Sequence, residues 1–148
     1  MLATGQRLAR PIWLAFLAEA TGHAGQVEEG LRLLAEALAA FEAIGRGDLL
    51  TEAYRLQGEL LLCQTVLDAT QAEAWLQQAL AIARRQQAKS WELRTAMSLS
   101  RLWQQQGKQD EARALLAPIY GWFTEGFDTA DLQEARALLE ALGEGKAL

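Results

Sequence analysis

The side chains best suited to chemistry in this chain are one histidine and one cysteine. His23 follows Glu19 by four residues, which places an imidazole and a carboxylate on one face of a helix. These two groups are half of a metal site, and the sequence has no second histidine to complete it. We therefore interpret His23 as a residue near the end of a helix and predict no metal site.

Cys63 is the only cysteine, so an internal disulfide is excluded. Its sequence neighbours include no basic residue that would favour the reactive thiolate, so the sequence predicts a buried, inert thiol. The alternative is a nucleophilic dyad with His23, because the two residues hold equivalent positions in the repeat described below.

A phosphate-binding loop is represented only by a weak match near the C-terminus. Residues 143–146 read Gly-Glu-Gly-Lys, with no strand expected before them and no helix after them. Because no polar triad, metal set or phosphate loop is found, we expect a protein that is not an enzyme and has no cofactor.

A repeated pattern of small residues indicates which elements position these side chains. One small residue recurs at Ala18, Gly58 and Ser100, in steps of 40 and 42 residues. A second small position, with a leucine four residues after it, recurs at Gly30 and Leu34, Ala72 and Leu76, and Ala112 and Leu116. Small residues let two helices approach closely, so each unit is predicted to be an antiparallel helix pair.

The clearest unit begins at Tyr54-x-x-Gln57-Gly58-x-x-Leu61 and is typical of a tetratricopeptide repeat. We predict an all-α fold, a right-handed tetratricopeptide-like solenoid of three helix pairs at about 11–45, 49–87 and 90–124. A capping helix at about 130–142 would follow, within a single domain of residues 1–148. The first helix is expected to begin at Pro11, which suits a first helical turn.

A more specific resemblance begins at Ser90. It includes Ser90-Trp91-Glu92-Leu93-Arg94, the run Trp-Phe-Thr-Glu-Gly-Phe-Asp at 122–128, and Leu-Gln-Glu-Ala at 132–135. These segments resemble the C-terminal sensor region of multidomain bacterial regulators, which join a nucleotide cyclase or DNA-binding domain to a signalling ATPase and a long tetratricopeptide-repeat region. The resemblance implies a sensor or scaffold in bacterial signalling, and it carries over no catalytic residues.

Composition and hydropathy indicate where in the cell the protein is expected. The net charge is −5, no apolar run approaches the ~18 residues of a membrane span, and no secretory signal is recognised. We therefore expect a cytoplasmic protein that does not enter a membrane.

The first helices of successive units are expected to line a concave groove. The positions facing this groove would be Ile12, Ala15, Glu19 and His23, then Glu52, Arg55, Glu59 and Cys63, then Arg94, Met97, Arg101 and Gln105. This groove is predicted to bind an extended protein segment or peptide with an acidic group near Arg94 and Arg101. Alternatively, the arginines pair with neighbouring glutamates.

Two other functions remain open. The groove could serve a small-ligand sensor. A basic band, which consists of Arg84, Arg85, Lys89, Arg94, Arg101 and Lys108, could serve a nucleic-acid adaptor, although an acidic chain makes nucleic acid an unlikely partner.

Two aromatic residues predict a second surface. Trp13 and Phe16 project from the first helix away from the seam of its helix pair. In a longer solenoid a preceding repeat would cover them, and exposed apolar patches of this kind mark interfaces. We therefore expect self-association as a homodimer or homo-oligomer through this N-terminal edge, or docking to an upstream domain of a longer parent.

Overall fold

The computed structural model describes residues 4–64 and 69–144. Within these residues the chain is helical and has no strand, which confirms the all-α prediction. The described helices are α1 (Thr4–His23), α2 (Val27–Ala43), the 3₁₀ turn η1 (Gly47–Leu49), α3 (Leu50–Leu62), α4 (Ala69–Arg85), α5 (Lys89–Gln105), α6 (Gln109–Trp122) and α7 (Ala130–Glu144).

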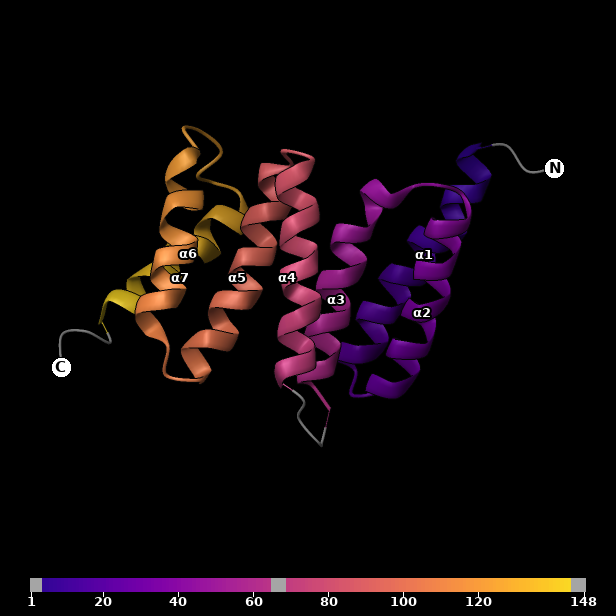
Figure 1. The fold of residues 1–148 in the computed structure, drawn as a ribbon, viewed down its shortest axis with the longest axis horizontal. Coiled ribbons are helices and arrows are strands. Elements are labelled where there is room, and N and C mark those ends of the chain that lie inside the picture. The colour runs from indigo at the N-terminus through magenta and orange to yellow at the C-terminus, as the bar shows by residue number, and fades with distance from the viewer. Residues whose placement is uncertain (1–3, 65–68, 145–148) are drawn as a thin grey trace. The chain divides into compact units, whose positions relative to one another are not determined.

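The contacts divide the chain into two compact units, Met1–Ile82 and Ala83–Leu148. The first contains α1, α2, α3 and most of α4, at the indigo-to-pink end of Figure 1. The second contains the last turn of α4 and then α5, α6 and α7. Whether the three predicted helix pairs form one continuous domain stays a prediction.

The same close helix crossing recurs at each predicted pair of small residues. A Cβ added to Gly30 on α2 would lie 2.9 Å from the carbonyl oxygen of Ala18 on α1. One added to Gly58 on α3 would lie 3.0 Å from the carbonyl oxygen of Ala72 on α4. Small side chains are therefore required at both crossings, because the opposing atom is backbone that cannot move aside.

The third crossing, between α5 and α6, contains a hydrogen bond. The Ser100 hydroxyl donates to the carbonyl oxygen of Ala112 at 3.2 Å, and both residues are fully buried. The leucines that follow the second small residue, Leu34, Leu76 and Leu116, are also fully buried. The spacing of the small residues thus corresponds to three physically similar helix contacts.

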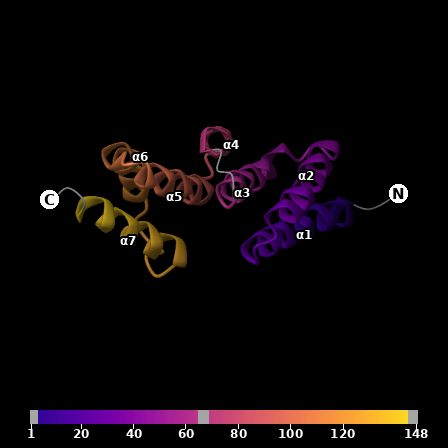
Figure 2. The ribbon, with the colours of Figure 1, turned by 90° about the horizontal axis from the view of Figure 1, so that it is seen from below.

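In the first unit α3 packs on both α1 and α2. Its Ala53, Leu56 and Leu60 belong to one apolar core with residues of α2, among them Leu33 and Phe41. Figure 2 shows the first three helices from below, with α2 crossing α1. Glycine enables the turn between these two helices, because Gly25 has a φ of +91°.

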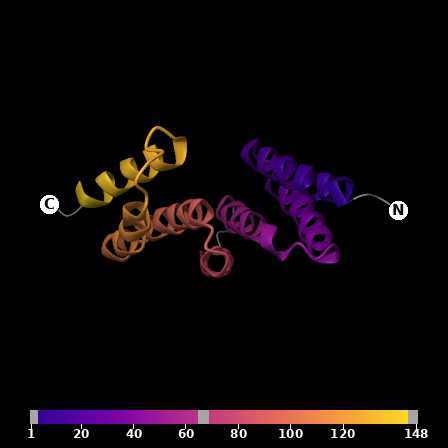
Figure 3. The same ribbon diagram turned by 90° about the horizontal axis from the view of Figure 1, so that it is seen from above.

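In the second unit α7 packs on both α5 and α6, and Figure 3 shows it beside them from above. Its inner face is apolar, with Leu132, Ala135, Leu138 and Leu142 buried. The turn before it is closed by Thr129, whose hydroxyl donates to the carbonyl oxygen of Gly126 at 2.7 Å.

One predicted helix start was wrong. Pro11 lies inside α1 instead of in its first turn, because α1 begins at Thr4. Residues 6–10 are mostly good helix formers, and they extend the helix N-terminally past the proline. The unit expected from about residue 90 begins with α5 at Lys89, and Ala88 is the N-cap of this helix.

Candidate protein-interaction surfaces

The outer face of α1 carries four exposed large apolar side chains. Trp13 and Phe16 are each 66% exposed, Leu17 is 39% exposed and Ile12 is 37% exposed. Ile12 and Phe16 are four residues apart, and so are Trp13 and Leu17, which brings the four side chains together on the helix surface. We call these four residues the α1 patch. The opposite face of α1 is also apolar, and its Leu14 and Ala18 are buried in the core with α2.

Two residues of the α1 patch have counterparts in α3 at the same positions of the repeat. Ala18 and Gly58 hold the same repeat position, so Trp13 and Phe16 correspond to Ala53 and Leu56 of α3. Those two α3 residues are 1% and 4% exposed, because they lie in the core that α3 shares with α2. Trp13 and Phe16 of the α1 patch therefore lie at the repeat positions that, in α3, are buried in an apolar core with α2.

The predicted groove positions of the first unit include a buried arginine, Arg55. The Arg55 side chain is only 8% exposed, and its guanidinium lies 3.0 Å from Glu52, 2.9 Å from Glu59 and 3.9 Å from Glu19. The geometry towards Glu52 is bidentate, because Nε and Nη2 each donate to one carboxylate oxygen at 3.0 Å. Three predicted groove carboxylates thus surround one arginine, leaving a net charge of about −2 for the four side chains.

Neighbouring charges and burial shift the pKa of Arg55 in opposite directions. Burial alone would lower the pKa of its guanidinium. The hydrogen bond with Glu52 and the charges of Glu59, Glu52 and Glu19 outweigh burial and raise that pKa above its ordinary value. Arg55 is consequently a fixed cation that holds α1 and α3 together through Glu19.

The predicted groove residues of the second unit face α7. Arg94 donates to Asp131 at 3.0 Å, and Arg101 to Glu134 at 3.4 Å. Met97, between them on α5, is 1% exposed, so the structure buries this predicted contact residue. Gln105 is exposed at the end of α5. An acidic ligand at these arginines would have to compete with the carboxylates of α7.

The remaining predicted positions lie in the first unit. Ile12 belongs to the exposed α1 patch, and His23 is exposed as the last residue of α1. A single groove would draw on residues of both units, and it stays a prediction.

The basic band is largely neutralised by ion pairs. Arg84 and Lys89 both bind Glu92, each at 3.1 Å, and Arg94 and Arg101 bind acidic residues of α7. Arg85 and Lys108 are exposed. Because phosphate binding needs a broad positive face, these pairings weigh against the nucleic-acid alternative.

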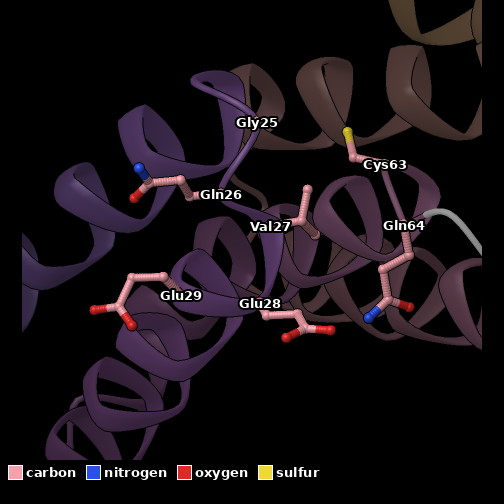
Figure 4. Close-up of a pocket in the computed structure, with 7 residues that line it drawn as sticks. All are labelled: Gly25, Gln26, Val27, Glu28, Glu29, Cys63 and Gln64. Carbon is pink, nitrogen blue, oxygen red and sulfur yellow. The ribbon is translucent and has the colours of Figure 1, made fainter.

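A cavity of about 820 Å³ opens in the first unit beside Cys63 (Figure 4). Residues 25–29 line it from the turn before α2 and the first turn of α2, and Cys63 and Gln64 line it from the segment just after α3. The expectation of a buried thiol was wrong, because Cys63 is the C-cap of α3 and is exposed. Among the described lining residues, the ionisable side chains besides the thiol are Glu28 and Glu29, and neither is a cation that would favour the thiolate of Cys63.

Among the residues that the structure describes, no group of three or more histidine, cysteine, aspartate or glutamate side chains could hold a metal ion. None of the described helices is both long and apolar enough to cross a membrane. Comparison of the chain with protein-family models and with curated proteins finds no match.

Sequence reasoning missed two features of these surfaces. It did not place Leu17 in the α1 patch or Asp131 and Glu134 opposite the α5 arginines. Leu17 could have been found from its spacing of four residues from Trp13. The carboxylates of α7 could not, because they lie 37 and 33 residues along the chain from their partners.

Proposed function

We propose that this protein is a non-enzymatic interaction module that binds a protein partner through the α1 patch. The observation that carries the proposal is that α1 is apolar on two faces, only one of which is covered. Trp13 and Phe16 remain two-thirds exposed at the repeat positions where α3 buries Ala53 and Leu56. An apolar patch of this kind is a site of association.

The helix crossings support a tetratricopeptide-like solenoid as the scaffold. In such a fold, each helix pair offers an apolar face to the next, so an uncovered face can accept one more helix. We propose that α1 presents such a face. The tetratricopeptide class rests on the repeated spacing and the three small-residue crossings, and the sensor role in bacterial signalling rests on the resemblance of residues 90–135.

The partner that fits the patch best is a second copy of the chain. A patch of two aromatic and two aliphatic side chains without a charge is self-complementary, as a two-fold symmetric contact requires. The proposed dimer would pack Trp13 and Phe16 of one copy against the same residues of the other. A protein or peptide bound at the predicted groove would then use a different surface of the dimer.

Light scattering across the micromolar range tests this proposal. The wild-type mass should rise from monomer towards dimer with concentration, and the double variant Trp13→Glu with Phe16→Glu should remain a monomer. The matched control is Ala35→Glu with Ala39→Glu, which adds the same charge to exposed positions of α2 and should dimerise normally. A wild type that stays monomeric at the highest concentration contradicts self-association.

A further inference from the structure

A second cavity lies in the second unit and includes two cations of the basic band. It measures about 540 Å³ and is lined by Arg84, Gln87, Lys89, Glu92 and Trp122. These residues come from the end of α4, the turn after it, the start of α5 and the end of α6. The volume lies within the range of sites that hold small molecules.

The charges of this cavity are organised around Glu92. Its side chain is only 6% exposed, and its two carboxylate oxygens accept hydrogen bonds from Arg84 Nε and Lys89 Nζ, each at 3.1 Å. The two cations are more open, at 53% for Arg84 and 34% for Lys89. The buried carboxylate therefore fixes two cations at the cavity, and the three groups carry a net charge of about +1.

An aromatic ring completes the wall. Trp122 is 57% exposed, and Lys89 Nζ lies 5.5 Å from the centroid of its ring. This cation–π contact places positive charge next to a flat apolar surface. A cationic ligand would be repelled by Arg84 and Lys89, whereas an anion attached to a flat ring would gain from both the charge and the indole.

The turn that brings Gln87 to the cavity has an unusual backbone. Gln87 has a φ of +54°, in the left-handed region that favours glycine. The turn between α5 and α6 makes the same pair of hydrogen bonds around a glycine: Gly107 N–H to Gln104 and Lys108 N–H to Trp103 correspond to Gln87 N–H to Arg84 and Ala88 N–H to Ala83. Glutamine thus occupies a backbone position that favours glycine, and its amide side chain lines the cavity.

We propose that this cavity binds a small organic anion with a flat ring, such as an aromatic carboxylate. Arg84 and Lys89 would bind the carboxylate, Trp122 would stack on the ring, and Gln87 would donate a hydrogen bond from its amide. The site lies within the second unit, so the proposal is independent of association through the α1 patch.

Calorimetric titration of the full chain with two probes of opposite charge tests the proposal. Naphthalene-1-carboxylate should bind, and naphthalen-1-ylmethylamine, with the same ring and a positive charge, should not. Trp122→Ala should weaken carboxylate binding at least about fivefold. Arg84→Gln should weaken it similarly, while the control Arg85→Gln, exposed on the same helix and outside the cavity, should not. Equal binding of both probes, or carboxylate binding unaffected by Trp122→Ala, would overturn the proposal.

Binding of the ring to the α1 patch is distinguished by Trp13→Ala. The patch carries no charge and would bind both probes, so Trp13→Ala would weaken both equally. Carboxylate binding at the proposed cavity should survive this substitution. Loss of carboxylate binding in Trp13→Ala, with Trp122→Ala unchanged, would place the probe at the patch and refute the cavity.

Gln87→Gly separates a ligand contact from a structural role. Relief of the left-handed strain should raise the thermal midpoint, while loss of the amide should weaken carboxylate binding. Gly107→Gln is the reverse control, and it should lower the thermal midpoint and leave binding unchanged. If Gln87→Gly stabilises the protein without changing the affinity, Gln87 is not a ligand contact and its part of the proposal is refuted.

Discussion

α1 and α3 are two versions of the same helix in different surroundings. Both cross their partner helix at a small residue, Ala18 in α1 and Gly58 in α3. The face of α3 that contains Leu56 is buried in a core with α2, whereas Phe16, at the corresponding position of α1, is 66% exposed. The comparison teaches that an apolar residue at this repeat position is a core residue or an interface residue according to whether a helix covers it.

α1 and α3 also differ in the charge of the side chain at one corresponding position. Arg55 of α3 is buried among three carboxylates, and the corresponding residue of α1 is Ala15. Because Glu19 of α1 is one of these carboxylates, the arginine on α3 links the two helices electrostatically. Substitutions at corresponding positions of α1 and α3 test which of these differences matter.

The largest effect should come from placing a charge at the same position of each helix. Leu56→Glu buries a carboxylate in the apolar core and should cost more than about 4 kcal/mol, enough to prevent α3 from packing. Phe16→Glu is the matched variant and should change the stability of the dilute monomer by less than about 0.5 kcal/mol. Urea denaturation followed by far-ultraviolet circular dichroism measures both, and equal costs would show that the two positions do not differ in burial as argued.

Arg55→Ala gives α3 the residue that α1 has. It leaves Glu19, Glu52 and Glu59 without their shared cation, and the expected cost is about 3 kcal/mol, because the carboxylates are partly solvated. Arg101→Ala, which removes one exposed ion pair, should cost at most about 1 kcal/mol. An Arg55→Ala cost as small as that of Arg101→Ala would contradict a central role for the cluster.

Gly58→Ala gives α3 the small residue of α1 and should cost about 2 kcal/mol. The added methyl would lie 2.7 Å from Leu76 Cγ and 3.0 Å from the Ala72 carbonyl oxygen. The control is Gly121→Ala on α6, where no atom lies within 4 Å, and it should stabilise the helix by roughly 0.5–1 kcal/mol. Thermal unfolding of the two variants should therefore shift in opposite directions, and a shift of Gly58→Ala to higher temperature would disprove the close crossing.

The smallest effect lies on the exposed surface of α2. Arg32 Nε donates to Glu29 at 3.0 Å, and this hydrogen bond lowers the pKa of Glu29 below its ordinary value of 4.5. A lowered pKa contributes stability above the unfolded value, and the contribution is lost as the pH falls through the folded value. Glu29→Gln should be slightly less stable than wild type at neutral pH and equally stable in acid. A difference that persists in acid would need another cause.

The sequence predicted the helix crossings well because they depend on residue size. Only a small side chain fits where two backbones touch, so Ala18, Gly58 and Ser100 mark the crossings without any knowledge of the tertiary structure. The exposure of Trp13 and Phe16 was predicted for a related reason. Both residues lie off the seam, and each is 66% exposed.

What the sequence could not predict depends on distant or marginal contacts. The carboxylates opposite Arg94 and Arg101 come from α7, and their pairing requires the packing of α7 on α5. The exposure of Cys63 depends on α3 ending at Leu62, and helix ends are the least predictable feature of a helical chain. Pro11 was misplaced because proline favours a first helical turn and disrupts a helix interior, yet α1 continues through it.

The most direct test of the account is the solvent access of Trp13 as a function of protein concentration. Acrylamide quenching of the wild type, with that of the Trp13→Phe variant subtracted, isolates this one indole. The account predicts that Trp13 is readily quenched in dilute solution and becomes protected as the concentration rises and a second copy covers the α1 patch. A Trp13 that remains equally accessible at every concentration, while the mass of the protein increases, would show that the association uses another surface and would contradict the central claim.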